Sequence, residues 1–265
     1  MKSRVITGAA GIAAVALIIY LGKYSMLSAL IIIQCIAAAE YYTLIYQKKS
    51  LPDLFFHFAA GSSLMLCAAF RFDLILPLMS CLIILIFAKD ILAGRNDAMT
   101  VIFSAWGLIH ISLFLSLGVR ILFLNGGLAM ISIVLVSTFV CDIAAYFGGF
   151  LFGKHKLCPE ISPKKTVEGA VFGFVFSAAA FSLGYLLNGF IDFADLSFFS
   201  YLAGGIAVSV FSQFGDLAAS LIKRKFSAKD FSSILPGHGG FLDRIDSILF
   251  SFASVYALFS FLGYF

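Results

Sequence analysis

Long apolar stretches recur along almost the whole chain, and short polar segments separate them. With a window of about 19 residues, nine stretches suit transmembrane helices, and they lie near residues 5–21, 25–46, 54–70, 74–88, 99–117, 127–150, 169–187, 198–221 and 248–264. Little chain is left for a separate soluble domain. The pattern therefore predicts an all-α, polytopic integral membrane protein with about nine transmembrane helices, five of them in residues 1–125 and the rest in residues 126–265.

Composition agrees with this prediction. Of the 265 residues, 62% are hydrophobic and only 12% are charged, whereas a soluble domain has about 25% charged residues. The five cysteines form neither a disulfide framework nor a zinc-binding spacing. An ordinary water-soluble globule is therefore excluded.

The cationic residues predict the orientation in the membrane, because short loops rich in Lys and Arg stay in the cytoplasm. With a cytoplasmic N-terminus and nine spans, 15 of the 18 Lys and Arg residues face the cytoplasm, and only Lys23, Arg71 and Arg120 face out. The C-terminus is then extracytoplasmic. The net charge of +4 indicates attraction to anionic lipid and not binding to nucleic acid.

Four acidic residues lie in or next to apolar stretches, where a charge is costly and usually functional. Glu40, Asp142 and Asp216 lie near the predicted cytoplasmic ends of their spans, and Asp243 precedes the last one. Glu40 has no basic or glycine-bearing motif beside it, so we interpret it as a structural hydrogen-bond partner and assign it no functional role. The other three each accompany such a motif.

The segment 220–246 reads SLIKRKFSAKDFSSILPGHGGFLDRID. Its glycines can turn backbone N–H groups toward a phosphate. Asp243 and Asp246 are three residues apart, which places them on one face of a helix. Carboxylates so placed suit Mg²⁺, which prefers oxygen ligands and is often shared with substrate phosphates.

A second segment, residues 142–169, is also basic and glycine-bearing. Its glycines at positions 148, 149 and 153 favour close packing between helices. Ser162 before Pro163 resembles a helix cap, and Thr166 lies at the opening of the next helix. A patch that binds lipid headgroups stays an alternative for its lysines.

Together these two segments resemble the phosphatidate cytidylyltransferases, the CDP-diacylglycerol synthases. The resemblance rests on S-x-x-K-R-x-x-x-x-K-D and P-x-H-G-G-x-x-D-R-x-D within residues 220–246, and on matching positions within residues 142–169. It implies transfer of the cytidylyl group of CTP to phosphatidate, in the inner (plasma) membrane with the active site facing the cytoplasm.

The resemblance also implies roles for single residues. Asp216 and Asp243 are expected to bind Mg²⁺, with Asp246 and Asp142 as further candidates and a second cation such as K⁺ beside it. Lys223 and Arg244 are expected at the catalytic centre. Substrate binding is expected from Lys223, Arg224, Lys229, His238, Gly239, Gly240, Ser162, Lys165 and Thr166.

Two rival functions remain open at this stage. Another CTP-dependent membrane enzyme, such as a polyprenol kinase or an ether-lipid cytidylyltransferase, would use a similar nucleotide site. A cation-coupled transporter would be expected to show inverted repeats and acids throughout the membrane depth, and the sequence has neither. A homodimer is kept as one alternative for the oligomeric state.

Overall fold

The computed structural model describes residue 11 and residues 14–48, 50–95, 97–190, 196–234 and 239–264. Contacts divide the chain into two compact units. The N-terminal unit comprises Met1–Phe123 and Asp230–Asp243, and the C-terminal unit comprises Leu124–Lys229 and Arg244–Phe265. The segment that precedes the last helix is thus grouped with the N-terminal unit, although it lies far from that unit in the sequence.

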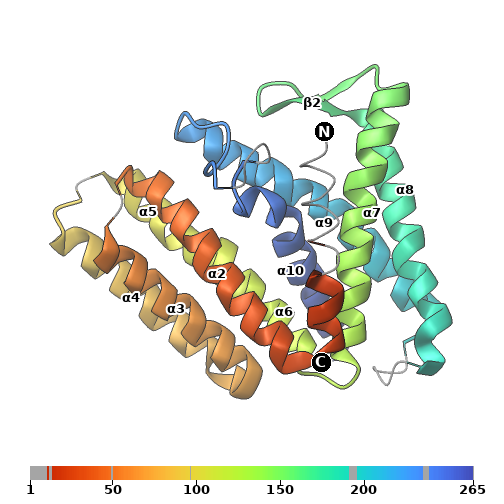
Figure 1. Cartoon of the computed structure of the whole chain (residues 1–265), viewed down its shortest axis with the longest axis horizontal. Helices are drawn as coiled ribbons and strands as arrows, with labels where there is room; N and C mark the ends of the chain where they lie inside the picture. The colour runs from red at the N-terminus through yellow and green to blue at the C-terminus, as the bar shows by residue number, and fades with distance from the viewer. Residues whose placement is uncertain are drawn as a thin grey trace. The chain divides into compact units, whose positions relative to one another are not determined.

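Helices make up most of the N-terminal unit (Figure 1). They are α2 (Lys23–Tyr46), α3 (Leu51–Phe70), the short η1 (Phe72–Leu74), α4 (Ile75–Leu92), α5 (Ala98–Gly107), the π-helical turn η2 (Leu108–Leu113) and α6 (Phe114–Leu122). Residues 14–20 are also helical, but residues 5–10, 12 and 13 of the first predicted span lie outside the described residues.

Tight packing in this unit depends on small residues. A Cβ atom at Gly107 would lie 2.4 Å from the Tyr41 ring, and one at Gly61 would lie 2.0 Å from the Gln34 side chain. Gly107 immediately precedes the π-helical turn. The absent side chain lets α2 approach α5 closely enough for side chains of α2 to reach the backbone of α5.

The C-terminal unit contains α7 (Gly127–Phe152), α8 (Val167–Leu183), η3 (Gly184–Phe190), α9 (Phe198–Lys225) and α10 (Asp246–Phe261), and η4 (Leu242–Arg244) ends at its border. Figure 1 shows α7 and α8 side by side. A Cβ atom at Gly148 would lie 2.5 Å from Phe172, and one at Gly169 would lie 2.6 Å from the Ala145 carbonyl oxygen. The predicted packing role is therefore confirmed for Gly148, and Cβ atoms at Gly149 and Gly153 would likewise lie 2.9 and 2.8 Å from Thr166.

A two-stranded antiparallel hairpin joins α7 to α8, and the sequence did not predict it. Strand β1 (Lys156–Cys158) pairs with β2 (Ser162–Thr166). Strand β2 contains Pro163, which removes a backbone donor and is tolerated at a sheet edge. The protein is mostly helical, with this hairpin as an addition to the predicted all-α fold.

Seven of the predicted spans correspond to helices that are long and apolar enough to cross a membrane. The last one differs, because α10 has only 16 residues, or about 24 Å at 1.5 Å per residue. A typical hydrocarbon core is about 30 Å thick. The polytopic membrane fold is confirmed, while the predicted number of nine spans is approximate.

Candidate functional site

Three carboxylates on three helices lie within electrostatic range of one another in the C-terminal unit. Asp142 lies on α7, Asp216 on α9 and Asp246 at the first position of α10. Asp142 and Asp246 each lie close enough to Asp216 for their charges to interact. Helix packing therefore brings together three of the four predicted metal ligands, although like charges repel and are costly to assemble.

Cations from separate elements accompany these acids. Lys165 Nζ on β2 lies 2.9 Å from Asp216 Oδ2, and Asp216 keeps a side-chain exposure of 38%. Lys223, which is buried, interacts with Asp246, and Arg244 interacts with Asp142. Lys165, Lys223 and Arg244, which the resemblance implies at the catalytic centre or in substrate binding, thus interact with the predicted metal ligands.

Strand β2 places Lys165 beside Asp216 of α9. The next residue, Thr166, caps the start of α8. The Thr166 hydroxyl accepts a hydrogen bond from Gly169 N at 3.2 Å and caps α8. The cap-like role predicted for Ser162 is wrong, because Ser162 lies in β2. Glu168 accepts hydrogen bonds from the Lys154 and His155 amides at 3.1 and 3.2 Å, so this acid organises the turn into the hairpin.

The cationic C-terminus of α9 lies near the same hairpin. Arg224 donates to the Ile161 carbonyl oxygen at 3.4 Å and to the Ala228 carbonyl oxygen at 3.1 Å. Both Arg224 and Lys229 are exposed. They are accessible to an anionic ligand, unlike the buried Lys223.

The remaining predicted metal ligand, Asp243, belongs to the N-terminal unit. Its Oδ2 atom accepts hydrogen bonds from Phe231 N at 3.0 Å and Gly240 N at 2.9 Å. Asp243 lies in η4, whereas Asp246 begins α10. The prediction that both acids share one helical face is therefore wrong, and Asp243 organises the loop that contains it.

The glycine turn is described only in part. Gly239 has φ +80°, a conformation that favours glycine, while His238 lies outside the described residues. The Gly240 N–H already donates to Asp243. In this conformation the Gly240 N–H therefore stabilises the loop by an internal hydrogen bond.

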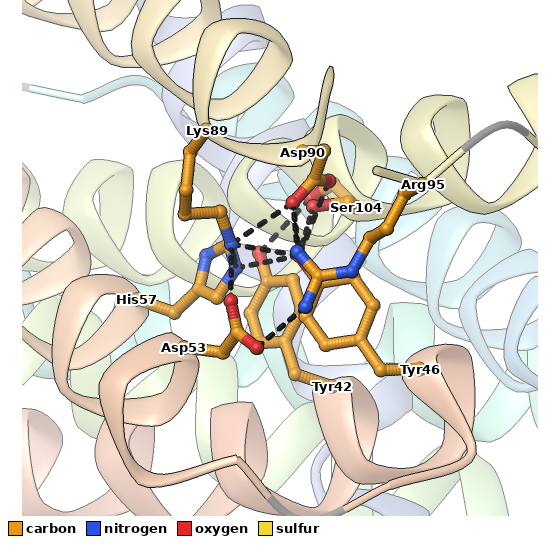
Figure 2. Close-up of polar contacts among 8 residues, drawn as sticks. All are labelled: Tyr42, Tyr46, Asp53, His57, Lys89, Asp90, Arg95 and Ser104. Carbon is orange, nitrogen blue, oxygen red and sulfur yellow. Dashed lines mark hydrogen bonds and ion pairs between the residues drawn. The ribbon is translucent and has the colours of Figure 1, made fainter. Parts of the chain in front are cut away.

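Sequence reasoning missed a charged cluster in the N-terminal unit, which Figure 2 shows. Lys89 Nζ lies 3.0 Å from Asp53 Oδ1 and 3.1 Å from Asp90 Oδ1, and Arg95 pairs with both acids at 2.5 Å. The Tyr46 hydroxyl donates to Asp90 and also contacts Lys89, His57 and Ser104. Helical spacing between Asp53 and His57, and the neighbouring charges at 89 and 90, are the only signals in the sequence.

The surroundings of Arg95 favour the ionised form of its side chain. Burial of Arg95 favours its neutral form, but the hydrogen bond to Asp53 and the charge of Asp90 raise the pKa of the guanidinium above its usual value. The guanidinium also stacks on the Tyr46 ring, with Cζ 3.9 Å from the ring centroid. The four charges of the cluster, two positive and two negative, sum to zero.

The chemistry of the acids in the C-terminal unit fits a hard cation. Among the described ranges, no group of three or more His, Cys, Asp or Glu side chains is arranged to hold a metal ion directly. Nevertheless, Asp142, Asp216 and Asp246 are oxygen donors in one charged neighbourhood, and Mg²⁺ prefers such donors while sharing its shell with water and phosphate.

These features define a membrane protein of several spans in which the C-terminal unit brings acids and cations together. Residues 2–262 match the cytidylyltransferase family, so this chain belongs to that family.

Named relatives agree with this membership. The chain is 38% identical over 157 residues to a phosphatidate cytidylyltransferase of Thermotoga maritima, which covers 58% of this chain and 57% of the relative. It is 46% identical over 132 residues to the enzyme of that name from Helicobacter pylori, covering 49% and 46%. For Staphylococcus haemolyticus the identity is 43% over 126 residues, covering 48% and 47%. The chain thus spans about half the length of the relatives it matches.

Proposed function

We propose that this protein transfers the cytidylyl group of CTP to phosphatidate and forms CDP-diacylglycerol and pyrophosphate. The observation that carries the proposal is the group of Asp142, Asp216 and Asp246 with Lys165 and Lys223 in a member of the cytidylyltransferase family. The activity named for the relatives is consistent with it.

The reaction suits the charges of this unit. A phosphate monoester has a second pKa near 6, so phosphatidate presents an anionic oxygen at neutral pH and needs little help from a general base. That oxygen attacks the α-phosphorus of CTP, and the bond between this phosphorus and the oxygen bridging to the β-phosphate breaks. Pyrophosphate takes the electron pair and leaves.

The main task of the protein is to bring two polyanions together and orient them. Lys165, Lys223 and Arg244 supply positive charge beside the acids. Fixed cations stabilise the charge of the transferred group and position it without reorganisation. The exposed side chains of Arg224 and Lys229 extend this positive charge outward.

Mg²⁺ is the proposed cofactor, and a second cation such as K⁺ is proposed beside it. Asp216, Asp246 and Asp142 would hold Mg²⁺, and Asp243 is retained as a candidate ligand on its own loop. When bound, Mg²⁺ would neutralise phosphate charge and act as a Lewis acid. Further substrate contacts are proposed for His238, Gly239, Gly240, Ser162 and Thr166, in addition to the cations above.

We also propose that the site faces the cytoplasm of the inner membrane, because CTP is a cytosolic nucleotide and the cations cluster on that side of the predicted topology. A reporter inserted near Lys48 or Pro159 should be cytoplasmic. A reporter fused after Phe265 should be extracytoplasmic. Cytoplasmic behaviour of the latter would mean that α10, with its 16 residues, does not cross the bilayer.

The experiment that tests the function is product analysis with purified protein, phosphatidate, Mg²⁺ and CTP labelled at either the α or the γ phosphate. Cytidylyl transfer puts the α label in a lipid and the γ label in pyrophosphate. A kinase would put the γ label in a lipid and release CDP. Ion movement in liposomes without any labelled lipid would instead support a transporter.

A further inference from the structure

Glu40 holds the loop segment Asp230–Asp243, although 190 or more residues separate it from that segment in the sequence. The Glu40 side chain is on α2 and is 2% exposed. Its Oε1 atom accepts hydrogen bonds from Ser232 Oγ at 2.5 Å and Phe241 N at 2.8 Å, and its Oε2 atom accepts one from Leu242 N at 2.7 Å. Both carboxylate oxygens are therefore engaged by a single segment, Asp230–Asp243.

These contacts stabilise both the buried Glu40 carboxylate and the backbone amides of the loop. A buried carboxylate is unfavourable unless hydrogen bonds compensate for lost water, and charge-assisted hydrogen bonds are about twice as strong as neutral ones. The amides of Phe241 and Leu242 lie at the start of η4, where a helix cannot satisfy its own first N–H groups. Glu40 supplies the missing acceptors.

The two carboxylates around the loop constrain the same glycine. A Cβ atom at Gly240 would lie 2.9 Å from Asp243 Oδ2 and also 2.9 Å from Glu40 Oε2. Asp243 fixes the loop from within by accepting from Phe231 N and Gly240 N, while Glu40 fixes it from α2. Loss of either acceptor would therefore change the path of the backbone between them.

Two hydrogen bonds to α5 fix helix α2 directly after Glu40. The Tyr41 hydroxyl donates to the Phe103 carbonyl oxygen at 2.8 Å, and the Tyr42 hydroxyl donates to the Ser104 carbonyl oxygen at 3.1 Å. One and a half turns further along α2, Tyr46 enters the charged cluster of Figure 2. Because these contacts hold α2 at three separate residues, loss of any single one still leaves Glu40 on a fixed element.

We infer that Glu40 is a positioning residue, which sets the conformation of Gly239–Asp243 without itself touching substrate. The catalytic part of this inference rests on the proposed function, since the loop includes Gly239, Gly240 and Asp243. The structural part does not depend on it.

Glu40→Gln is the most informative variant, because it keeps the shape of the side chain. An amide has a single accepting oxygen, whereas both oxygens of Glu40 accept from donors. Whichever way the amide turns, its NH₂ group faces at least one donor of the loop. Loss of a residue that orients functional side chains commonly lowers activity about 10–100-fold. We therefore expect kcat of Glu40→Gln to decrease by about 10–100-fold relative to the wild type.

The matched control is Tyr42→Phe, which removes one buried hydrogen bond from the same helix two residues away. The Tyr42 hydroxyl donates to the Ser104 carbonyl oxygen of α5 and not to the loop. Both variants should shift the thermal unfolding midpoint by similar small amounts. Only Glu40→Gln should lower kcat, and Tyr42→Phe should retain kcat near that of the wild type.

Amide hydrogen exchange of the loop gives a measurement that needs no activity. In Glu40→Gln, the amides of Phe241 and Leu242 should exchange at least ten times faster than in wild type and in Tyr42→Phe. Unchanged exchange in Glu40→Gln, or equal loss of kcat in both variants, would overturn the inference. If the wild type forms no CDP-lipid, the proposed function fails, and the exchange rates alone decide the structural role of Glu40.

Discussion

The two charged regions of this protein assemble their acids in opposite ways. In the N-terminal unit, Asp53 and Asp90 are both paired with Lys89 and Arg95. In the C-terminal unit, Lys165, Lys223 and Arg244 accompany the acids, but the acids also lie near one another, and the Asp216 side chain is 38% exposed. Pairing of opposite charges lowers the cost of burial, whereas grouping of like charges raises it.

This difference indicates which region holds the fold and which performs chemistry. The paired cluster ties α2, α3, α4 and α5 together and satisfies its own charges (Figure 2). The group of like charges is a cost that a ligand can relieve, and such unfavourable arrangements concentrate at functional sites. Substitutions in the two regions should therefore separate stability from activity.

The largest effect should follow from Asp90→Asn, because Asp90 is fully buried between two cations. Breaking a buried ion pair from one side commonly costs about 3–5 kcal/mol. The thermal unfolding midpoint and the folded yield in detergent should fall strongly, while turnover per folded molecule stays close to that of the wild type.

Asp73→Asn is the control for this change, since it breaks an exposed ion pair in the same unit. The Arg71 and Asp73 side chains are 67% and 63% exposed, and such pairs contribute little. A stability loss in Asp73→Asn as large as that in Asp90→Asn would contradict the structural role of the buried cluster.

Asp216→Asn should have the second largest effect, and it should act on activity. Loss of a proposed Mg²⁺ ligand would weaken the stabilisation that the metal gives to developing charge, and removal of one such stabilising group costs about 10²–10³ in rate, or roughly 2.7–4 kcal/mol. A neutral residue is also cheaper than a charged one at membrane depth, so the folded amount should be maintained. Initial rates over a range of Mg²⁺ concentrations provide the measurement, and near-normal rates at every concentration would remove Asp216 from the site.

Gly240→Ala should have an intermediate effect, because its new methyl group would meet two carboxylates and the Ser232 amide within 3.0 Å. Overpacking of this kind typically costs about 1–3 kcal/mol. Gly22→Ala is the control, since Gly22 has φ +91° but open space around it. A loss of stability in Gly240→Ala that does not exceed the control would mean that the loop is less tightly held than the structure indicates.

The smallest change in stability is expected for Lys165→Met. Lys165 and Asp216 are 24% and 38% exposed, and partly exposed ion pairs contribute at most about 1 kcal/mol. Its effect should appear in kinetics, as a higher KM for CTP or a lower kcat at normal folded yield. Kinetics equal to those of the wild type would limit Lys165 to a structural pairing with Asp216.

The membrane fold could be predicted well, because hydrophobic length alone defines a span. The acids could be identified for the same reason, since a charge within an apolar stretch is conspicuous. The hairpin could not, because Lys156–Cys158 is too short to show a strand pattern and Ser162–Thr166 contains a proline.

The role of Glu40 and the charged cluster could not be predicted either. The prediction that Glu40 is a structural hydrogen-bond partner is confirmed, but its donors, Ser232, Phe241 and Leu242, lie far away in sequence and could not be identified. Likewise, in the sequence alone Lys89 and Arg95 indicate only the orientation in the membrane. Pairing across helices depends on packing that no local pattern records.

The central claim is tested most directly by transfer of label from α-labelled CTP into lipid, measured for equal folded amounts of the wild type, Asp216→Asn and Asp90→Asn. The account predicts phosphatidate-dependent lipid label for the wild type, a loss of about 10²–10³ for Asp216→Asn, and near-normal label for Asp90→Asn. Absence of labelled lipid from the wild type, or equal losses in the two variants, would contradict it.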